Sequence, residues 1–433
     1  MADIRPFRGW RYNPTRVRDL SQVITQPYDK IPKELQQKYN ERHPNSFVNL
    51  ILPSAPDPYS FSATTFKLWS QQLVLVRDSD PTIYVLHQDF EVAGQKKTRK
   101  SFVAAIRVDE FEKGTVLPHE RTLSKPKADR LSLLRATRAD YEQIFMLYDD
   151  PQGVVERALT PTGEPLMKAT DDYGVVQKVW AISDPAKLAA VRKALADKVV
   201  LMADGHHRYE TALNFRQEME RAGNVPDDAA LRFKSTAFVN IADPGLVILP
   251  TNRLLFGLNS PKWNDIVAGL GKWFETRAIK DAEIEGALSD RGRLGQLAKA
   301  GTDHVFVLHT GKNRSWVLRL TDKAAVEQLI KDHTADYQDL DVAILHSLLI
   351  ENVLGIKVAD IEDHVAYERG LAETLAKVDS FKYQAAFIIN PTRADQVQKV
   401  AAHGERMPQK STDFYPKFVS GLVFMDVGDN ERL

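Results

Sequence analysis

The chain has no cysteine among its 433 residues, and this absence excludes several kinds of chemistry. Without thiols there are no disulfides, thiolate nucleophiles, cysteine-ligated zinc sites or iron–sulfur clusters. The chain also lacks an excess of charge of either sign, since 58 Lys and Arg residues balance 58 Asp and Glu residues. That balance argues against one large basic face for nucleic acid. A metal site can still be built from His, Asp or Glu.

Long apolar segments are missing as well. No apolar run approaches the ~20 residues needed to span a bilayer, and the first ten residues contain no apolar region typical of a secretory signal. We therefore expect a cytoplasmic protein that does not enter a membrane. The fingerprints GxGxxG and GxxxxGK[ST] are also absent, which weighs against an ordinary Rossmann or P-loop nucleotide site.

The residues that are present indicate a globular protein of mixed secondary structure. Apolar residues make up 43% of the chain and charged residues 27%, and the length corresponds to roughly two to three domains. Residues 82–90 and 99–108 predict a hairpin. The three prolines in residues 51–59 predict a loop, followed by a helix over residues 65–77, and residues 418–427 predict a closing strand.

We expect an α/β to α+β fold in which helices accompany mixed sheets. The predicted organisation is an N-terminal region over residues 1–223, with its core at about residues 80–223, and a C-terminal α+β region over residues 224–433. The boundary between the two regions is placed in a short polar segment, residues 224–228.

The segment most informative about function is residues 199–213 (VVLMADGHHRYETAL). An apolar strand leads into Asp204 and Gly205, and a helix follows that begins near His206, His207 and Arg208. Glycine permits a tight turn, and a helix start exposes unpaired backbone N–H groups at the positive end of its dipole. The pattern predicts a phosphate-binding site, in which Asp204 could hold a metal or orient a hydroxyl. The alternative is a structural turn with an ion pair at the helix start.

A second candidate segment, residues 116–127 (VLPHERTLSKPK), combines acidic and basic side chains. Glu120 is a candidate general base if burial or a neighbouring group tunes it, and Arg121 and Lys125 are candidate phosphate contacts. No second histidine follows at the spacing of a zinc-protease motif, so this segment is not one. The alternative interpretation is a solvated, charged loop.

Three further places carry weaker candidates. Lys410 and Ser411 are residue types that suit a phosphate or a substrate, but no glycine-rich loop precedes them, so they do not form a Walker A site. Tyr28 and Asp29 lie in an expected turn and suit either substrate contact or packing. Arg253 follows a strand and is either a phosphate contact in a cleft or a member of a structural ion pair.

The motifs together resemble the bacterial and archaeal family called domain of unknown function 1015. The resemblance covers nearly the whole chain and is carried, in order, by FRGWRYN, QPYDKIP, HPNSFVNLILP, LPHERT with DRLSLL, ADGHHRYETAL, ILPTNRLL and MPQKSTDFYPK. Two positions depart from the family pattern. Gln26 stands where the family usually has proline, and Asp413 stands where it usually has an aromatic residue. The second departure leaves the function of the C-terminal loop open.

The ADGHHR segment is also similar to the phosphate-binding motif of the ParB/sulfiredoxin-like superfamily. That resemblance implies a ParB/sulfiredoxin-like central core and a nucleotide phosphate held at a helix start by Gly205, His206, His207 and Arg208. Members of the superfamily include partition proteins, sulfiredoxins and free-serine kinases. Sulfiredoxin chemistry is excluded because it needs a cysteine, and the charge balance does not support the DNA-binding branch.

The kinase-like branch remains, and it implies a nucleotide-dependent phosphotransferase with free L-serine as the best single substrate. Mg²⁺ and ATP or ADP are the implied cofactors, Asp204 is the candidate metal ligand, and Glu120 is the implied base. Two alternatives stay open: hydrolysis of a phosphate monoester such as phosphoserine, and a nucleotide-binding or nucleic-acid-associated protein without turnover. We expect a small phosphate or nucleotide ligand, no nucleic acid and no membrane, and we keep a homodimer as a candidate assembly.

Overall fold

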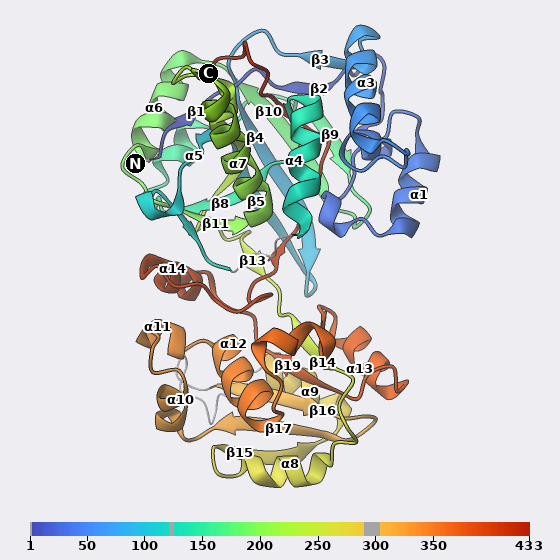
Figure 1. The fold of residues 1–433 in the computed structure, drawn as a ribbon, viewed down its shortest axis with the longest axis vertical. Coiled ribbons are helices and arrows are strands. Elements are labelled where there is room, and N and C mark those ends of the chain that lie inside the picture. The colour runs from blue at the N-terminus through green and yellow to red at the C-terminus, as the bar shows by residue number, and fades with distance from the viewer. Residues whose placement is uncertain (1, 121–124, 290–303) are drawn as a thin grey trace. The chain divides into compact units, whose positions relative to one another are not determined.

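The computed structural model describes residues 2–120, 125–289 and 304–433, which fall into two compact units. Unit 1 comprises Met1–Pro118, Thr122–Val247 and Phe414–Leu433, and unit 2 comprises His119–Arg121 and Ile248–Asp413 (Figure 1). The chain therefore leaves unit 1 and later returns to it, which a single boundary at residue 223 does not describe.

Unit 1 is built on a nine-stranded mixed sheet. Its strands are β1 (Ile4–Arg5), β4 (Ile83–Val92), β5 (Gln95–Arg107), β6 (Val116–Pro118), β8 (Ile144–Tyr148), β9 (Met167–Thr170), β10 (Val176–Ile182), β11 (Val200–Asp204) and β12 (Phe233–Asn240). The order is β6-β11-β8-β12-β5-β4-β10-β9, with β1 paired to β5. β11 runs parallel to β6 and β12 parallel to β8, whereas the other pairs are antiparallel. The predicted hairpin is confirmed as β4 and β5.

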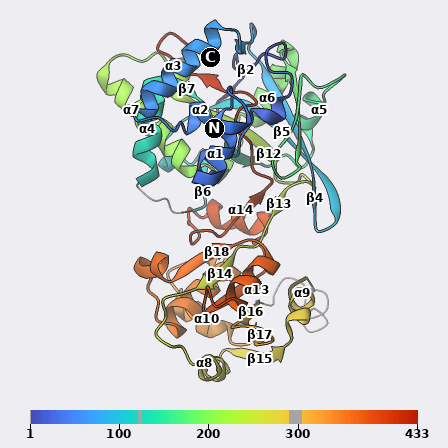
Figure 2. The same ribbon diagram turned by 90° about the vertical axis from the view of Figure 1, so that its right-hand side faces the viewer.

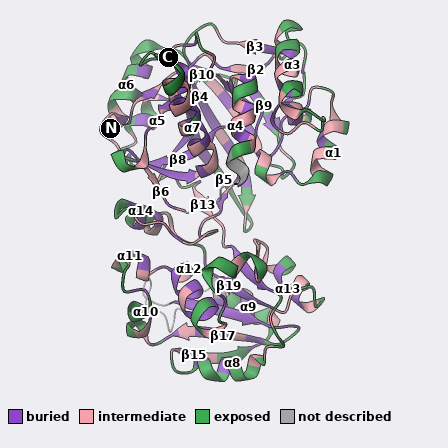
Figure 3. Ribbon diagram, viewed as in Figure 1, coloured by how far each residue is buried: buried purple, intermediate pink, exposed green. Residues whose placement is uncertain are grey.

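Helices pack on both faces of this sheet. They are α1 (Lys33–Arg42), α2 (Val48–Ile51), α3 (Pro58–Gln71), α4 (Lys125–Thr137), α5 (Val154–Ala158), α6 (Pro185–Leu195) and α7 (His206–Ala222). One core cluster includes Trp69 of α3 and Leu133 of α4, and the other includes Val155 of α5 and Val191 of α6. Figure 3 shows the buried strands between the more exposed helices. Burial of apolar side chains on both faces fixes the sheet as the centre of unit 1.

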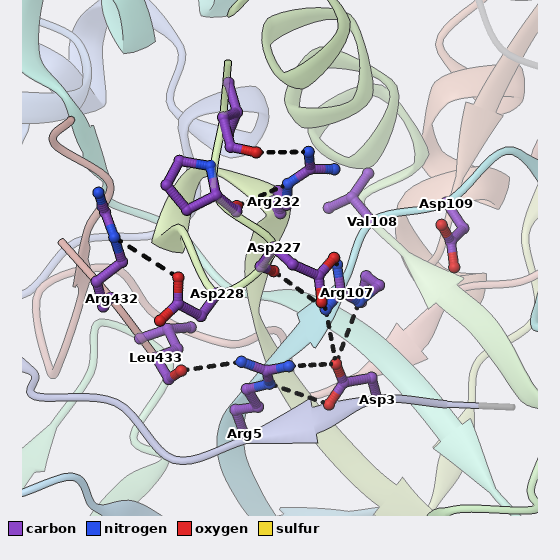
Figure 4. Close-up of polar contacts among 12 residues, drawn as sticks. Asp3, Arg5, Arg107, Val108, Asp109, Asp227, Asp228, Arg232, Arg432 and Leu433 are labelled. Carbon is purple, nitrogen blue, oxygen red and sulfur yellow. Dashed lines mark hydrogen bonds and ion pairs between the residues drawn. The ribbon is translucent and has the colours of Figure 1, made fainter. Parts of the chain in front are cut away.

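The last residues of the chain belong to unit 1 through polar contacts with its first strand (Figure 4). Arg5 Nη1 donates a hydrogen bond to the backbone oxygen of Leu433 at 2.9 Å. Arg107 donates to Asp3 and to Asp227, each at 3.1 Å.

Two short strand pairs also belong to unit 1: β2 (Trp10–Tyr12) with β3 (Leu75–Arg77), and β7 (Ala139–Asp140) with β21 (Met425–Asp426).

Unit 2 is built on a six-stranded antiparallel sheet of order β15-β17-β16-β19-β14-β18, seen from a second direction in Figure 2. Its strands are β14 (Asn252–Leu255), β15 (Phe274–Ile279), β16 (Val305–His309), β17 (Ser315–Leu320), β18 (Val365–Glu368) and β19 (Ala385–Ile389). Its helices are α8 (Trp263–Leu270), α9 (Asp281–Ser289), α10 (Lys323–Leu329), α11 (Ala335–Gln338), α12 (Asp341–Ile344), α13 (Leu371–Asp379) and α14 (Ala394–Ala402). α12 continues directly into a π-helix, η5 (Leu345–Val353).

The mixed fold class is confirmed, and two local predictions are wrong. The proline-rich segment is not loop throughout, because Pro58 is the first residue of α3 and the Asp57 side chain caps it by accepting from the Ser60 amide at 3.2 Å. α3 begins before the predicted helix start and ends at Gln71, before the predicted helix end. The predicted closing strand is reduced to Met425–Asp426, since Gly421 adopts a left-handed φ of 101° that interrupts extended backbone.

The division into units also differs from the predicted regions. β12 follows the predicted boundary in sequence, yet it pairs with β5 and β8 inside the sheet of unit 1. None of the helices within the described ranges is both long and apolar enough to cross a membrane.

Candidate functional site

The turn between β11 and α7 places Asp204 at the end of a buried strand and Gly205 at the start of a 17-residue helix. Gly205 has a left-handed φ of 92°, and a Cβ atom there would lie 2.8 Å from Ile144 Cγ2. Both the backbone conformation and the close contact favour glycine. The helix is anchored behind the turn because Tyr209 and Ala212 are buried in the core. The predicted strand, turn and helix are confirmed.

The start of α7 carries no side-chain cap, because its N-cap residue is Gly205. The first backbone amides of any α-helix, here those of His206, His207 and Arg208, have no acceptor within the helix. They also lie at the positive end of the helix dipole. His206 is buried and His207 is half-buried. The start of α7 therefore places several backbone N–H groups and the positive end of the helix dipole at one point.

Asp204 is surrounded by cations. Lys417 Nζ donates to Asp204 Oδ2 at 2.6 Å, and Arg208 Nη2 lies 3.9 Å from Asp204 Oδ1. Burial acts to raise the pKa of Asp204, but Lys417, Arg208 and, more weakly, Lys30 hold that pKa well below its ordinary value. The carboxylate is therefore ionised at every physiological pH, and three cations act on it.

Arg208 is anchored rather than free to swing into solvent. Its side chain is 12% exposed, and Nη1 donates to the backbone oxygen of Gln143. Burial acts to lower the pKa of Arg208, but Glu142, Asp204 and Asp29 raise it above the ordinary value. Arg208 is a fixed, permanently charged group beside the first turn of α7.

The N-terminal segment Tyr28–Lys30 belongs to the same neighbourhood. The Tyr28 amide donates to Glu142 Oε1 at 3.0 Å, and the Arg130 guanidinium lies 4.3 Å from the centre of the Tyr28 ring. Burial raises the pKa of Tyr28 to about 12, with Arg208 acting in the opposite direction. Unit 1 thus brings Tyr28 and Asp29 to the residues at the start of α7, as the mutual electrostatic effects on Arg208 also indicate.

Apart from Lys125, which belongs to unit 1, the other candidates lie in unit 2. Arg253 is 0% exposed, and its three nitrogens donate to Thr251 O, to Lys410 O at 3.1 Å and to His346 Nε2 at 3.3 Å. Burial lowers its pKa to about 10. Because Arg253 is fully buried and its nitrogens already donate inside the protein, a direct phosphate contact would require the surrounding structure to open.

Glu120 and the C-terminal loop are joined to each other within unit 2. The backbone amide of Ser411 donates to Glu120 Oε1 at 3.0 Å, and the Ser411 hydroxyl donates to Pro408 O at 2.6 Å. Lys410 is exposed and has a left-handed φ of 57°. Arg121 lies outside the described residues. Lys125 opens α4, but its side chain is not described.

The structure adds three charged residues that the sequence patterns did not single out: Lys417, Lys30 and Glu142. Lys417 ends the segment MPQKSTDFYPK and Lys30 lies within QPYDKIP, so membership of these two segments was the available signal. Glu142 has no such signal. Among the residues that the structure describes, no group of three or more His, Asp or Glu side chains is arranged to hold a metal ion.

The family model described as "Protein of unknown function (DUF1015)" matches residues 4–343. The chain belongs to this family. No curated protein matches it.

Several solved structures resemble parts of this DUF1015 protein, each covering 76% of it. A conserved hypothetical protein from Pyrococcus furiosus has 12% identity, a TM-score of 0.36 and 97% of its own chain covered. A free serine kinase in complex with AMP has 12% identity, a TM-score of 0.37 and 93% covered. SbnI with C-terminal truncation from Staphylococcus aureus has 11% identity, a TM-score of 0.32 and 84% covered. Likeness at these scores carries no inference about activity.

Proposed function

We propose that unit 1 binds the phosphates of a nucleotide at the start of α7, and that the protein transfers a phosphoryl group to a small hydroxyl compound. The observation that supports this best is the uncapped helix start at Gly205 beside Arg208 and Lys417. Helix starts of this kind bind phosphate through backbone amides and the dipole. Cationic side chains at the same point strengthen the hydrogen bonds to an anion.

In this proposal the amides of the first turn and the two cations neutralise charge on the phosphates in the transition state. His206 and His207 add donors from the first turn of α7. Asp204 orients the substrate hydroxyl or binds Mg²⁺, which would neutralise phosphate charge when it is bound with ATP or ADP. Because Lys417 already donates to Asp204, metal binding would require Lys417 to move from the carboxylate to the phosphate.

Free L-serine is the substrate that the resemblance of the ADGHHR segment suggests, and Glu120 is the candidate general base. Glu120 belongs to unit 2, whereas the proposed phosphate site belongs to unit 1. Enzyme kinetics of a Glu120 variant therefore test whether Glu120 takes part in the reaction. In a coupled assay with ATP and L-serine, Glu120→Gln should lower kcat by about a hundredfold and leave ADP affinity unchanged. Equal activity of the variant would remove Glu120 from the mechanism.

The phosphate site is tested by calorimetric titration with ADP. Lys417→Met should weaken ADP binding by about tenfold, since one charge-assisted hydrogen bond is lost. The matched control is Lys178→Met, because Lys178 Nζ also lies 2.6 Å from a carboxylate in unit 1, that of Asp89. ADP affinity that falls equally in both variants, or in neither, would contradict the proposed site.

A further inference from the structure

Three sequence segments that carried candidate residues meet inside unit 2. The Ser411 amide donates to Glu120 Oε1 at 3.0 Å, which ties the C-terminal loop to residues 119–120. Arg253 Nη2 donates to Lys410 O at 3.1 Å, which ties the same loop to β14. The buried guanidinium of Arg253 therefore lies against the backbone of the C-terminal loop at Lys410.

Arg253 is a buried cation without an ion pair. It is completely buried and forms no ion pair with a carboxylate of the described residues, although the Glu120 carboxylate acts on its charge from a greater distance. Its acceptors are two backbone carbonyls, of Thr251 and Lys410, and one imidazole nitrogen of His346. A fully buried charge is seldom left without a counter-charge, so the surroundings of Arg253 deserve a functional explanation.

The contact with Arg253 determines the protonation of His346. A guanidinium nitrogen can only donate, so His346 Nε2 accepts and the ring proton is on Nδ1. Burial and the Arg253 charge hold the pKa of His346 well below its ordinary value, which keeps the ring neutral. Within the described parts of the chain, Nδ1 has no hydrogen-bond partner. His346 therefore carries an N–H donor that is polarised by Arg253 and unused by the protein.

His346 lines a cavity of about 750 Å³ in unit 2. The side chain is 9% exposed and comes from η5, a π-helix, a local distortion that is frequent at functional sites. The cavity wall is apolar at Ile330, Tyr337 and Ile361 and polar at Ser347 and elsewhere. Its size is in the range of small-molecule sites, about 300–1,000 Å³.

Acidic side chains on the same wall restrict the charge of a ligand. Two carboxylates, those of Asp332 and Glu351, line the cavity together with the Arg406 guanidinium and the His333 imidazole. A dianion such as a phosphate monoester would be repelled by both carboxylates, whereas a single negative charge held at His346 meets less repulsion. The apolar part of the wall suits a hydrocarbon or aromatic body.

We propose that this cavity binds a small organic monocarboxylate, whose carboxylate accepts the hydrogen bond from His346 Nδ1 and receives the field of Arg253 behind it. The apolar body of the ligand packs against Ile330, Tyr337 and Ile361. This site lies wholly in unit 2 and goes beyond the phosphate site proposed at the start of α7.

Two substitutions separate the two nitrogens of His346. His346→Asn keeps an amide donor near the position of Nδ1, and His346→Gln keeps an acceptor near the position of Nε2 for Arg253 but removes the donor toward the cavity. With benzoate as the probe in a calorimetric titration, wild type and His346→Asn should bind. His346→Gln should bind about tenfold more weakly, as expected for loss of a hydrogen bond to a charged group.

Equal benzoate affinity in His346→Gln, tighter binding of phenyl phosphate than of benzoate, or no binding of benzoate to wild type would overturn the proposal. If His346→Gln fails to fold, the wild-type protein still provides the test by ¹⁵N NMR of labelled histidines. The His346 Nδ1–H signal should shift on addition of benzoate but not of benzyl alcohol, and an unmoved signal contradicts the proposal. Benzoate binding should be unchanged in Lys417→Met, so failure at this site is distinguishable from failure at the phosphate site.

Discussion

Asp204 in unit 1 and Arg253 in unit 2 show two ways of placing a charge inside this protein. Asp204 is surrounded by Lys417, Arg208 and Lys30, which keep it ionised. Arg253 is more deeply buried, yet only neutral oxygens and one imidazole nitrogen receive its hydrogen bonds. The difference indicates that Asp204 is stabilised by its neighbours, whereas Arg253 polarises a neighbour. The two positions should therefore respond differently to removal of their charge.

The largest expected effect is the contrast between Asp204→Asn and Arg253→Met. Asp204→Asn removes the carboxylate that Lys417 binds and one of the acidic groups that act on Arg208. It should cost about 3 kcal/mol of unfolding free energy, the lower end for a buried pair, because the Asp204 side chain keeps 29% exposure. Arg253→Met removes an unpaired charge but leaves two carbonyls without donors, at a cost of about 1 kcal/mol. Urea denaturation of both variants measures the contrast, and a larger loss for Arg253→Met would reverse it.

A smaller effect is expected from the backbone that presents Asp204. Gly205→Ala places a Cβ in a left-handed conformation and 2.8 Å from Ile144 Cγ2, which should cost about 2 kcal/mol. Gly174→Ala is the control, because its φ is also positive, at 77°, but no atom lies within 4 Å of the added Cβ. The control should lose about 1 kcal/mol in the same denaturation measurement. Equal losses would mean that the contact with Ile144 is easily relieved.

Two histidines of unit 2, His304 and His346, differ in the same way, since one is charged beside carboxylates and the other is neutral beside a cation. Burial acts to lower the pKa of His304, but Asp339 and Asp341 outweigh it and raise the pKa to about 9. Because the pKa of His304 in the folded protein is above 6.5, its charged ring stabilises the fold fully below pH 6.5. That contribution is lost as the pH rises toward 9. The pKa of His346 is lowered, so its neutral ring stabilises the fold above pH 6.5 and that contribution is lost as the pH falls.

Denaturation at several pH values checks these opposite signs. Relative to wild type, His304→Gln should flatten the pH dependence of the unfolding free energy between pH 6.5 and 9. His346→Gln should flatten it only below pH 6.5. If both variants alter the same pH range, the assignment of one charged and one neutral histidine is wrong.

Much of the local structure near Asp204 could be predicted from sequence, because its causes are local. The apolar run, the glycine and the following helical pattern lie within residues 199–213, and the structure has β11, Gly205 and α7 there. Lys417 could not be placed, since it lies 213 positions from Asp204 and reaches it only through the fold. The same limit applies to Glu142, whose partners Tyr28 and Ser420 lie 114 and 278 positions away in the sequence.

Unit 2 was harder to predict because burial changes what its side chains do. An arginine after a strand was compatible with a phosphate contact or an ion pair, and Arg253 forms no ion pair within the described residues. The π-helix around His346 could not be predicted, because apolar spacing does not distinguish a π-helix from an α-helix. The division of the chain was missed because residues 414–433 return to unit 1 after the whole of unit 2.

The central claim is that the start of α7 binds nucleotide phosphate, and a crystal structure of the protein with ADP tests it most directly. The account predicts a phosphate group within hydrogen-bonding distance of the backbone amides of His206 and His207, with Lys417 Nζ turned from Asp204 toward a phosphate oxygen. ADP bound with its phosphates away from residues 205–208, while Lys417 stays on Asp204, would contradict it.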